Sequence, residues 1–450
     1  MGNRLNNAID NALQGIGSFQ VVDSQPYEAQ NWSEMYAPFR GKIVFWPFDC
    51  TRMELMRFLS AVQQGVIPVM TSPMIPRLKF DSLKKKYCNW GCLEDDGSIS
   101  GSNLSTCEEQ LLFIATTSGS SGSPKFIAAT SDNLQASVTA IHKAQRLENV
   151  ESTAVWLPFF FNFSLINQLL WAVLFEKKLI LLPGMKQAGA SFSIMRETKA
   201  EMICWVNSQA RMIQRMGFKA SDALPAVKQV NFGGAPFPMH FLDYLREIFP
   251  NSEFINNYGC TEALSRMSMC RVHDKHQDIT LVGETIESAT LREKDGKLEF
   301  TGTSKTPGEV RNDGRIDRYG QWVPTGDMGY IKDGKIHVLG RYDQVFNNSG
   351  ERLSLVEIEV VLLKIPGVEN AYAWTVTPFQ GEEEPVAVIQ GDDMPSADDI
   401  RYYLKAYLPH AAWPKSLYWA GEWPLTDRGK DDRQTIKDNV EQNKYQMIEV

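Results

Sequence analysis

The sequence predicts an α/β fold in which a large N-terminal part of layered sheets and helices precedes smaller units. Three observations lead to this prediction. Between about residues 40 and 260, short apolar runs alternate with segments of helical periodicity, as in parallel sheets with crossover helices. From residue 280 short strands are divided by Asp-Gly turns, and after residue 341 strands and helices mix. Because 450 residues exceed one ordinary core, we expect more than one domain.

The elements of the first part follow from the apolar runs and their spacing. Residues 1–40 are polar with few apolar positions, and their role stays open. Strands are predicted at residues 43–45, 66–70, 111–115, 126–129, 154–158, 179–182, 202–206, 227–232 and 254–257. Helices are predicted at residues 53–64 and from Ser131 or Asp132 to residue 144.

Residues 157–175 form the longest apolar stretch, which Asn162, Ser164, Asn167 and Gln168 interrupt. These polar residues make the stretch a poor membrane span, and it predicts a buried helix with a polar lining.

The later elements are shorter. Asp295-Gly296, Asp313-Gly314 and Asp333-Gly334 predict hairpins, and therefore a small β-rich subdomain. Beyond residue 341 we expect helices at residues 355–364 and 398–407, with strands at residues 371–376 and 386–389.

Composition excludes several classes of partner. The net charge of -8 gives no broad electrostatic footprint for nucleic acid or anionic lipid. The seven cysteines are odd in number and include no Cys-x-x-Cys motif. The first residues do not show the basic segment followed by an apolar segment that is typical of a secretory signal peptide. We therefore expect a cytoplasmic protein with reduced thiols.

A loop of glycine and small hydroxyl residues lies between the strands predicted at residues 111–115 and 126–129. It reads Thr116-Thr117-Ser118-Gly119-Ser120-Ser121-Gly122-Ser123-Pro124-Lys125. Its backbone N–H groups, hydroxyls and lysine suit a polyphosphate, although the loop alone also fits a surface linker. It differs from the common phosphate loop, because Pro124 separates Gly122 from Lys125 and a strand follows.

This loop and several later motifs resemble the adenylate-forming superfamily of acyl-CoA synthetases, peptide-synthetase adenylation enzymes and luciferases. The later motifs, in the order and spacing of that family, are Gly233-Gly234-Ala235-Pro236, Tyr258-Gly259-Cys260-Thr261-Glu262, Trp322-Val323-Pro324-Thr325-Gly326-Asp327, Gly340-Arg341-Tyr342-Asp343, Ser349-Gly350-Glu351-Arg352-Leu353 and Pro424-Leu425-Thr426-Asp427-Arg428-Gly429-Lys430. The resemblance implies an N-terminal domain at residues 1–340, with its β-rich subdomain at residues 280–340. A hinge at residues 341–345 and a mobile α+β C-terminal domain at residues 346–450 would follow.

The resemblance also implies roles for single residues in binding ATP and Mg²⁺. The phosphates would be held by Thr117, Ser118, Gly119, Ser120, Gly122 and Lys125. Around the adenine would lie Tyr258, Gly259, Gly234, Ala235, Pro236 and Asn256. The remaining nucleotide contacts would be Thr261 to the α-phosphate, Glu262 and Thr117 to Mg²⁺, and Asp327 and Arg341 to the ribose. Lys430 would bridge the attacking carboxylate and the nucleotide, and Asp343 would be the hinge. Gly350 and Arg352 would serve a second, thioester-forming step with the pantetheine arm of coenzyme A or of a carrier protein.

The acid site would include Phe161, Asn162, Gly233 and Ser265. Amino-acid-activating relatives carry an aspartate where this chain has Asn162, and a neutral amide cannot pair with an ammonium ion. We therefore expect an aryl or apolar carboxylic acid rather than an α-amino acid. The stretch Pro158-Phe159-Phe160-Phe161 keeps an aromatic residue where coenzyme A ligases often have histidine.

The hypothesis from the sequence is an ATP-dependent acid–thiol ligase that forms an acyl-adenylate and passes the acyl group on, with coenzyme A as the first choice of acceptor. Three alternatives stay open. The acceptor could be a free-standing acyl carrier protein or an amine, or the chain could be a degenerate relative that binds nucleotide without turnover.

Overall fold

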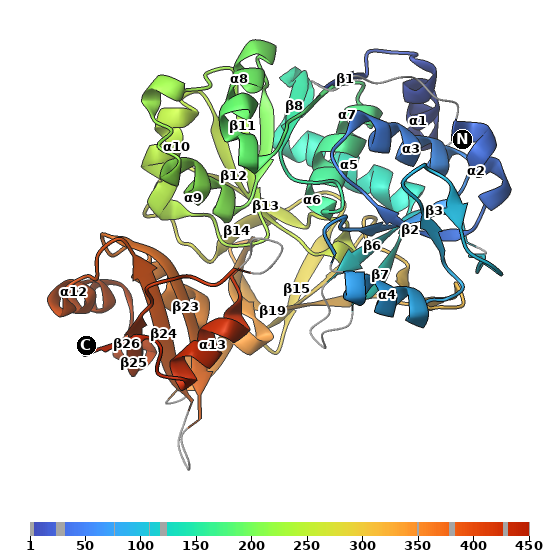
Figure 1. Cartoon of the computed structure of the whole chain (residues 1–450). Helices are drawn as coiled ribbons and strands as arrows, with labels where there is room; N and C mark the ends of the chain where they lie inside the picture. The colour runs from blue at the N-terminus through green and yellow to red at the C-terminus, as the bar shows by residue number, and fades with distance from the viewer. Residues whose placement is uncertain are drawn as a thin grey trace.

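The computed structural model describes residues 4–23, 32–75, 77–107, 109–117, 124–348, 351–377, 383–425 and 431–449. At residues 186, 343, 347, 348, 351 and 352 the description covers the backbone alone. The N-terminal three quarters of the chain form the larger body, and the C-terminal quarter packs beside it (Figure 1).

The larger sheet of this body is parallel on one side and antiparallel on the other. In spatial order it contains β1 (Gln20–Val22), β9 (Lys178–Leu181), β8 (Ser152–Val155), β10 (Met202–Trp205), β11 (Gln229–Gly233), β12 (Glu253–Tyr258), β13 (Ser268–Val272), β14 (Leu281–Thr285), β20 (Lys335–Arg341), β19 (Val323–Lys332), β16 (Lys297–Thr301) and β15 (Thr290–Lys294). Neighbours pair in parallel from β1 to β12 and antiparallel from β12 to β15.

A second sheet packs in the same body. Its spatial order is β18 (Ile316–Arg318), β17 (Gly308–Val310), β7 (Lys125–Thr130), β6 (Leu111–Thr117), β3 (Ile67–Thr71), β2 (Ile43–Pro47), β4 (Gly91–Leu93) and β5 (Ile99–Ser100). The helices of this body are α1 (Arg4–Gln14), α2 (Trp32–Tyr36), α3 (Arg52–Gln63), α4 (Arg77–Lys86), α5 (Ser131–Gln145), α6 (Asn162–Ser164), η3 (Leu165–Leu170), α7 (Trp171–Leu174), α8 (Ala188–Thr198), α9 (Asn207–Arg215) and α10 (Leu242–Ile248). Short helical turns connect them at η1 (Ala37–Phe39), η2 (Leu147–Asn149), η4 (Met185–Gln187), η5 (Ala220–Asp222), η6 (Met239–Phe241) and η7 (Thr261–Ala263).

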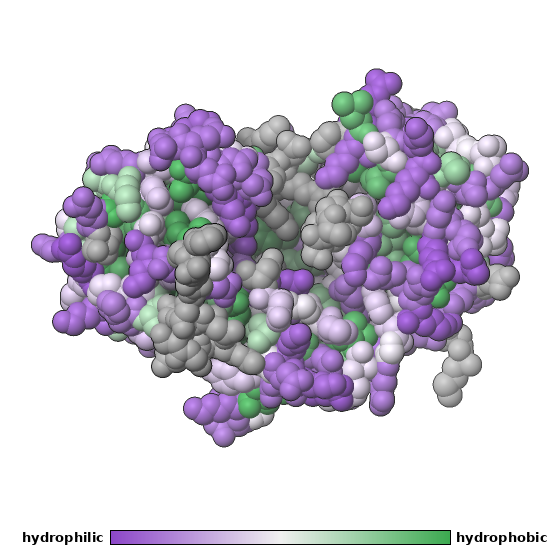
Figure 2. All heavy atoms as spheres, turned by 90° about the horizontal axis from the view of Figure 1, so that it is seen from below, coloured by the Kyte–Doolittle hydropathy of each residue, from purple (hydrophilic) through white to green (hydrophobic). Residues whose placement is uncertain are grey.

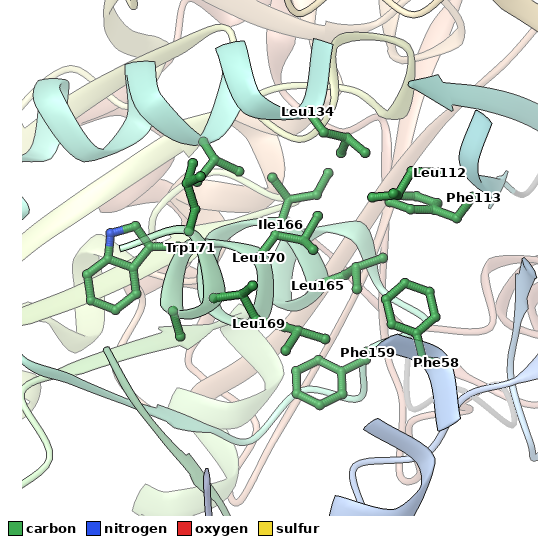
Figure 3. Packing of buried hydrophobic residues seen from close by; sticks show 14 of the residues in the cluster. Phe58, Leu112, Phe113, Leu134, Phe159, Leu165, Ile166, Leu169, Leu170 and Trp171 are labelled. Atoms are coloured by element: carbon green, nitrogen blue, oxygen red, sulfur yellow. The ribbon is translucent and has the colours of Figure 1, made fainter. Parts of the chain in front are cut away.

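The helix predicted in residues 157–175 is confirmed and lies at the centre of the core. Leu165, Ile166, Leu169 and Leu170 pack with Phe58 of α3 and Leu134 of α5 (Figure 3). Its middle part, η3, is a π-helix, a wider form that often occurs at functional sites. The polar lining is hydrogen-bonded, because Gln168 donates to Thr153 Oγ1 at 2.7 Å and to the Ala154 carbonyl at 2.8 Å.

The predicted hairpin turns are present in the second half of the body. Asp295 and Gly296 join β15 to β16 with φ values of 54° and 77°, and Asp333 and Gly334 join β19 to β20 with 50° and 74°. Asp and Gly tolerate this left-handed conformation, which matches the twist of the paired strands.

The C-terminal quarter has its own sheet and core. It contains η8 (Tyr342–Gln344), β21 (Val345–Asn348), β22 (Glu351–Ser354), α11 (Leu355–Leu362), β23 (Val368–Val376), β24 (Glu384–Gly391), α12 (Ala397–Tyr407), η9 (His410–Ala412), β25 (Ser416–Trp419), α13 (Arg433–Glu441) and β26 (Gln446–Ile448). Ile358, Ile389 and Leu417 are buried in its interior. An ion pair between Arg215 of α9 and Glu369 of β23 joins it to the larger body.

The N-terminal residues contribute elements that the sequence did not reveal. Helix α1 buries Leu5 and Ile9 against the central core, and β1 pairs with β9 at the edge of the larger sheet.

The surface seen from below is mostly hydrophilic, and hydrophobic residues show there as small separate areas (Figure 2). Within the described residues, no helix combines the length and apolar character needed to cross a membrane.

Candidate functional site

Three of the predicted nucleotide residues meet where β12 ends beside β19 and β20. The Tyr258 hydroxyl donates to Asp327 Oδ2 at 2.7 Å. Arg341 Nη1 donates to Asp327 Oδ1 at 3.2 Å and to the Thr325 carbonyl at 2.9 Å. Asp327 and Arg341 are direct partners in the β19–β20 register.

Gly326 allows Arg341 to lie across this hairpin. It has φ +81°, and a Cβ atom there would come within 2.5 Å of the Arg341 guanidinium. Any side chain would therefore displace the arginine as well as strain the backbone.

Burial dominates the electrostatics of this cluster. It raises the pKa of Asp327 above the usual range for aspartate, while the hydrogen bonds from Tyr258 and Arg341 lower it. Burial and the neighbouring Asp327 carboxylate raise the pKa of Tyr258, so its hydroxyl stays protonated. The carboxylate is thus held between two donors.

The tight turns at the ends of β11 and β12 differ, because the first leaves open space and the second is filled. Gly234 has φ +80°, and nothing lies within 4 Å of where its Cβ would be. A Cβ on Gly259 would come within 2.2 Å of the Ser265 carbonyl oxygen, so only glycine fits there. Asn256 is 2 % exposed on β12, and its side chain has no hydrogen-bond partner within the described residues.

The predicted phosphate loop is the connection of the β6–β7 hairpin. Thr117 pairs with Lys125 in the register that closes this loop. Lys125 Nζ lies 2.8 Å from Glu309 Oε1, and the Tyr319 hydroxyl lies 3.4 Å from the same oxygen. Ser118, Gly119, Ser120 and Gly122 lie outside the described residues.

Glu262 faces the same region. Burial raises the pKa of the Tyr319 hydroxyl, and the Glu262 and Glu309 carboxylates raise it further. The described residues contain no group of three potential metal-ligating side chains. One carboxylate nevertheless suits Mg²⁺, which is often held by one or two carboxylates and substrate phosphates. Thr261 precedes Glu262 in η7, beside the end of β12.

Two of the predicted acid residues, Gly233 and Ser265, are linked through Phe163 and Asn167 in a group that we call the wall. A Cβ on Gly233 would lie 3.2 Å from the Phe163 ring. Asn167 of η3 donates to Ser265 Oγ at 2.6 Å and to the Phe163 carbonyl at 2.6 Å. The Asn162 side chain has no hydrogen-bond partner in the described part of the chain, and Phe161 packs on Phe160 with ring centroids 4.3 Å apart.

Arg266, which no sequence pattern indicated, contacts this wall. Its side chain is fully buried, and Nη2 donates to Asn167 Oδ1 at 2.6 Å. An arginine four residues after Glu262 of the Thr261-Glu262 motif, between Ser265 and Met267, was the available signal.

The residues predicted for the second half of the reaction are only partly described. Gly350 and Lys430 lie outside the described residues, and Asp343 and Arg352 are described by their backbone alone. Asp431, the neighbour of Lys430, accepts from Trp423 Nε1 at 2.8 Å. Burial lowers the pKa of Arg211 of α9, while the Asp431 carboxylate raises it.

Taken together, the fold and the site define an α/β protein whose Tyr258–Asp327–Arg341 cluster lies at the carboxyl end of β12. The family model for AMP-binding enzymes matches residues 62–314. The chain belongs to this family, and it is an AMP-forming ligase of the adenylate-forming superfamily that activates a carboxylic acid with ATP.

Relatives and solved structures agree with this assignment. The D-alanine–D-alanyl carrier protein ligase of Bacillus licheniformis is 25% identical over 74% of this chain and 72% of its own length. The oxalate–CoA ligase of Arabidopsis thaliana is 28% identical over 73% of this chain and 67% of its own length. O-succinylbenzoate coenzyme A synthetase of Bacillus subtilis, in complex with AMP, has a similar fold. Its TM-score is 0.77 at 17% identity, over 97% of this chain and 98% of that one.

Proposed function

We propose that the enzyme adenylates an aryl or apolar carboxylic acid that lacks an α-amino group, and transfers the acyl group to the thiol of coenzyme A. The observation that carries this proposal is the Tyr258–Asp327–Arg341 cluster, which lies on the same edge of the sheet as Gly233 and Ser265. Such an edge, at the carboxyl ends of parallel strands, is where α/β enzymes bind their ligands.

In this proposal the ribose binds Asp327 and Arg341. Asp327 accepts from both hydroxyls, and the Tyr258 ring covers the adenine. Gly234, Ala235, Pro236 and Gly259 form the opposite side of the adenine slot, where the open space at Gly234 leaves room for the base. Asn256, buried without a partner in the described part, supplies a hydrogen bond to the purine edge.

The triphosphate lies along the loop at residues 117–125. Lys125 leaves Glu309 and pairs with the β- and γ-phosphates. The same phosphates accept hydrogen bonds from the hydroxyls and backbone N–H groups of the loop, at Thr117, Ser118, Gly119, Ser120 and Gly122. Thr261 contacts the α-phosphate. Glu262 and Thr117 supply oxygens for Mg²⁺, which when bound neutralises phosphate charge.

In the first step a carboxylate oxygen of the acid bonds to the α-phosphorus of ATP. The bond between the α-phosphorus and the pyrophosphate oxygen breaks, and pyrophosphate leaves. Positioning and charge neutralisation account for most of such a step, and Lys430 provides a cation between the carboxylate and the ribose. In the second step the thiol loses its proton, its sulfur bonds to the acyl carbon, and AMP leaves.

The second step requires the C-terminal domain, proposed as residues 346–450, to turn about the hinge at residues 341–345. The separate core around Ile358 and Leu417 supports a unit that moves as one body. Asp343 changes its backbone dihedrals, Lys430 withdraws, and Gly350 and Arg352 approach the pantetheine arm and the nucleotide phosphate.

The test measures pyrophosphate release with a panel of carboxylic and amino acids, followed by thioester formation with coenzyme A, a holo carrier protein or an amine. Pyrophosphate release with an acid that lacks an amino group, followed by acyl-CoA formation, is the expected result. Transfer only to the carrier protein or amine would assign the acceptor differently. Nucleotide binding without pyrophosphate release would indicate a non-catalytic relative.

A further inference from the structure

Arg266 is a buried cation with too few partners. Its side chain is 0% exposed, and Nη2 reaches Asn167. Within the described residues, Nε and Nη1 have no hydrogen-bond partner, and no carboxylate lies within ion-pair distance of the guanidinium. Folded proteins rarely bury a charge without a partner, because the lost hydration must be replaced.

The guanidinium is anchored on η3 through Asn167. The Asn167 amide also donates to Ser265 Oγ and to the Phe163 carbonyl. Burial raises the pKa of the Cys204 thiol of β10 to about 12, and the Arg266 charge lowers it. Burial lowers the pKa of Arg266 to about 9, so the side chain stays protonated at neutral pH.

The backbone before Arg266 is specialised for this placement. Leu264 and Ser265 are successive residues in the left-handed region, with φ values of 51° and 81°. Non-glycine residues rarely adopt this conformation. The Arg266 Cα lies beside Gly259, where a Cβ would come within 2.8 Å of it, while the Tyr258 side chain points to Asp327.

We propose that Arg266 narrows the substrate class to acids whose aryl or apolar body carries a second anionic group, as in a dicarboxylic acid. The proposal rests on the proposed function, because it concerns the acid that this site adenylates. The reacting carboxylate lies toward the nucleotide, and the second carboxylate accepts from Nε and Nη1, the two nitrogens without a partner in the described part. The same cation disfavours an ammonium group, in agreement with the neutral Asn162.

The test compares matched acids in the pyrophosphate-release assay, with the full-length enzyme. Adipate is compared with hexanoate and isophthalate with benzoate, and phenylalanine represents acids with an ammonium group. We expect the wild type to prefer the dicarboxylates by at least about tenfold in kcat/KM, as for a hydrogen-bonded buried charge. Arg266→Met should abolish the preference, and Arg266→Lys should keep part of it. The KM for ATP should stay similar in both.

Arg57→Met is the matched control, because Arg57 is another buried arginine but is paired with Glu54 at 2.7 Å. It should leave the ratio between the acids unchanged. A preference that persists in folded Arg266→Met, or a wild type that prefers monocarboxylates, overturns the inference. If Arg266→Met does not fold, as judged by circular dichroism, the wild-type ratio and Arg266→Lys decide.

The two proposals fail in different ways. Pyrophosphate release without a preference for the dicarboxylates overturns this inference alone. Arg266→Met could also raise the KM for ATP equally with every acid and leave the ratio of kcat/KM between dicarboxylates and monocarboxylates unchanged. That result would assign Arg266 to nucleotide binding and would also overturn this inference. No release with any acid overturns the proposed function and this inference with it.

Discussion

Tyr258 donates to Asp327 across 2.7 Å, from the end of a parallel strand to the middle of an antiparallel hairpin. The contact joins the two halves of the larger sheet where we propose that the nucleotide binds. Because Arg341 donates to the other carboxylate oxygen, the Asp327 side chain is oriented before any ligand arrives. Preorganisation of this kind lowers the entropy lost on binding.

Asp327→Ala should therefore raise the KM for ATP by about 10- to 100-fold, as expected for the loss of hydrogen bonds to a charged group. The KM for the acid should change less. Steady-state kinetics with each substrate varied in turn measure both effects. Asp317→Ala, which removes an exposed carboxylate that pairs with Arg311, is the control. An unchanged KM for ATP would contradict the ribose role.

Gly233→Val should reduce activity with bulky acids while leaving ATP binding intact. Even a Cβ would lie 3.2 Å from the Phe163 ring, so the larger side chain must push that ring into the proposed acid site. We expect increases of about 1–3 kcal/mol in the activation free energy, as for a change of one methylene in a hydrophobic substrate pocket, that grow with acid size. Competition kinetics with short and long acids measure this dependence. Gly189→Ala is the control, since nothing lies within 4 Å of that position.

Lys430→Ala should lower adenylation by about 10²–10³-fold, the usual cost of a positioned group that stabilises developing charge. Thioester formation from supplied acyl-AMP should be spared, because that step does not use the lysine. Rapid-quench assays of each half-reaction separate the two. Equal loss of both steps would refute this role. Lys444→Ala removes an exposed lysine of the same C-terminal quarter and controls for the lost charge.

Glu359 of α11 should make stability depend on pH. Burial raises its pKa to about 7, although Arg433 and the Ala373 N–H lower it. The folded state therefore binds a proton more tightly than the unfolded state. The resulting stabilisation is complete below the ordinary glutamate pKa and is lost as the pH rises through about 7.

Glu359→Gln removes this titration and can still accept from Ala373. Relative to the wild type, the variant should gain about 1–3 kcal/mol in the free energy of unfolding between pH 5 and 8. Denaturant unfolding at several pH values, followed by circular dichroism, measures the difference. If the difference in the free energy of unfolding between the variant and the wild type is constant across this range, Glu359 does not titrate there. Glu441→Gln, which removes an exposed carboxylate, is the control.

Local patterns predicted most of the fold. Alternating apolar runs located the parallel strands, and the Asp-Gly pairs located the hairpins, because both depend on neighbouring residues. Helix α1 was missed although Leu5, Ile9 and Leu13 recur at helical spacing, because the residues between them are mostly polar and its partners lie far along the chain. Arg266 was missed for a related reason. Two left-handed residues turn its side chain into the wall, and no short pattern predicts such a turn at Leu264 and Ser265.

Strand β1 is only three residues long, yet it pairs with β9 at the margin of the larger sheet. A polypeptide that began at residue 40 would lack α1 and β1. Strand β9 would then expose unpaired backbone N–H and C=O groups, beside the apolar surface that Leu5 and Ile9 otherwise cover. Unprotected strands of this kind recruit other chains. Shortening the protein from this end would thus favour self-association and poor solubility before it affected catalysis.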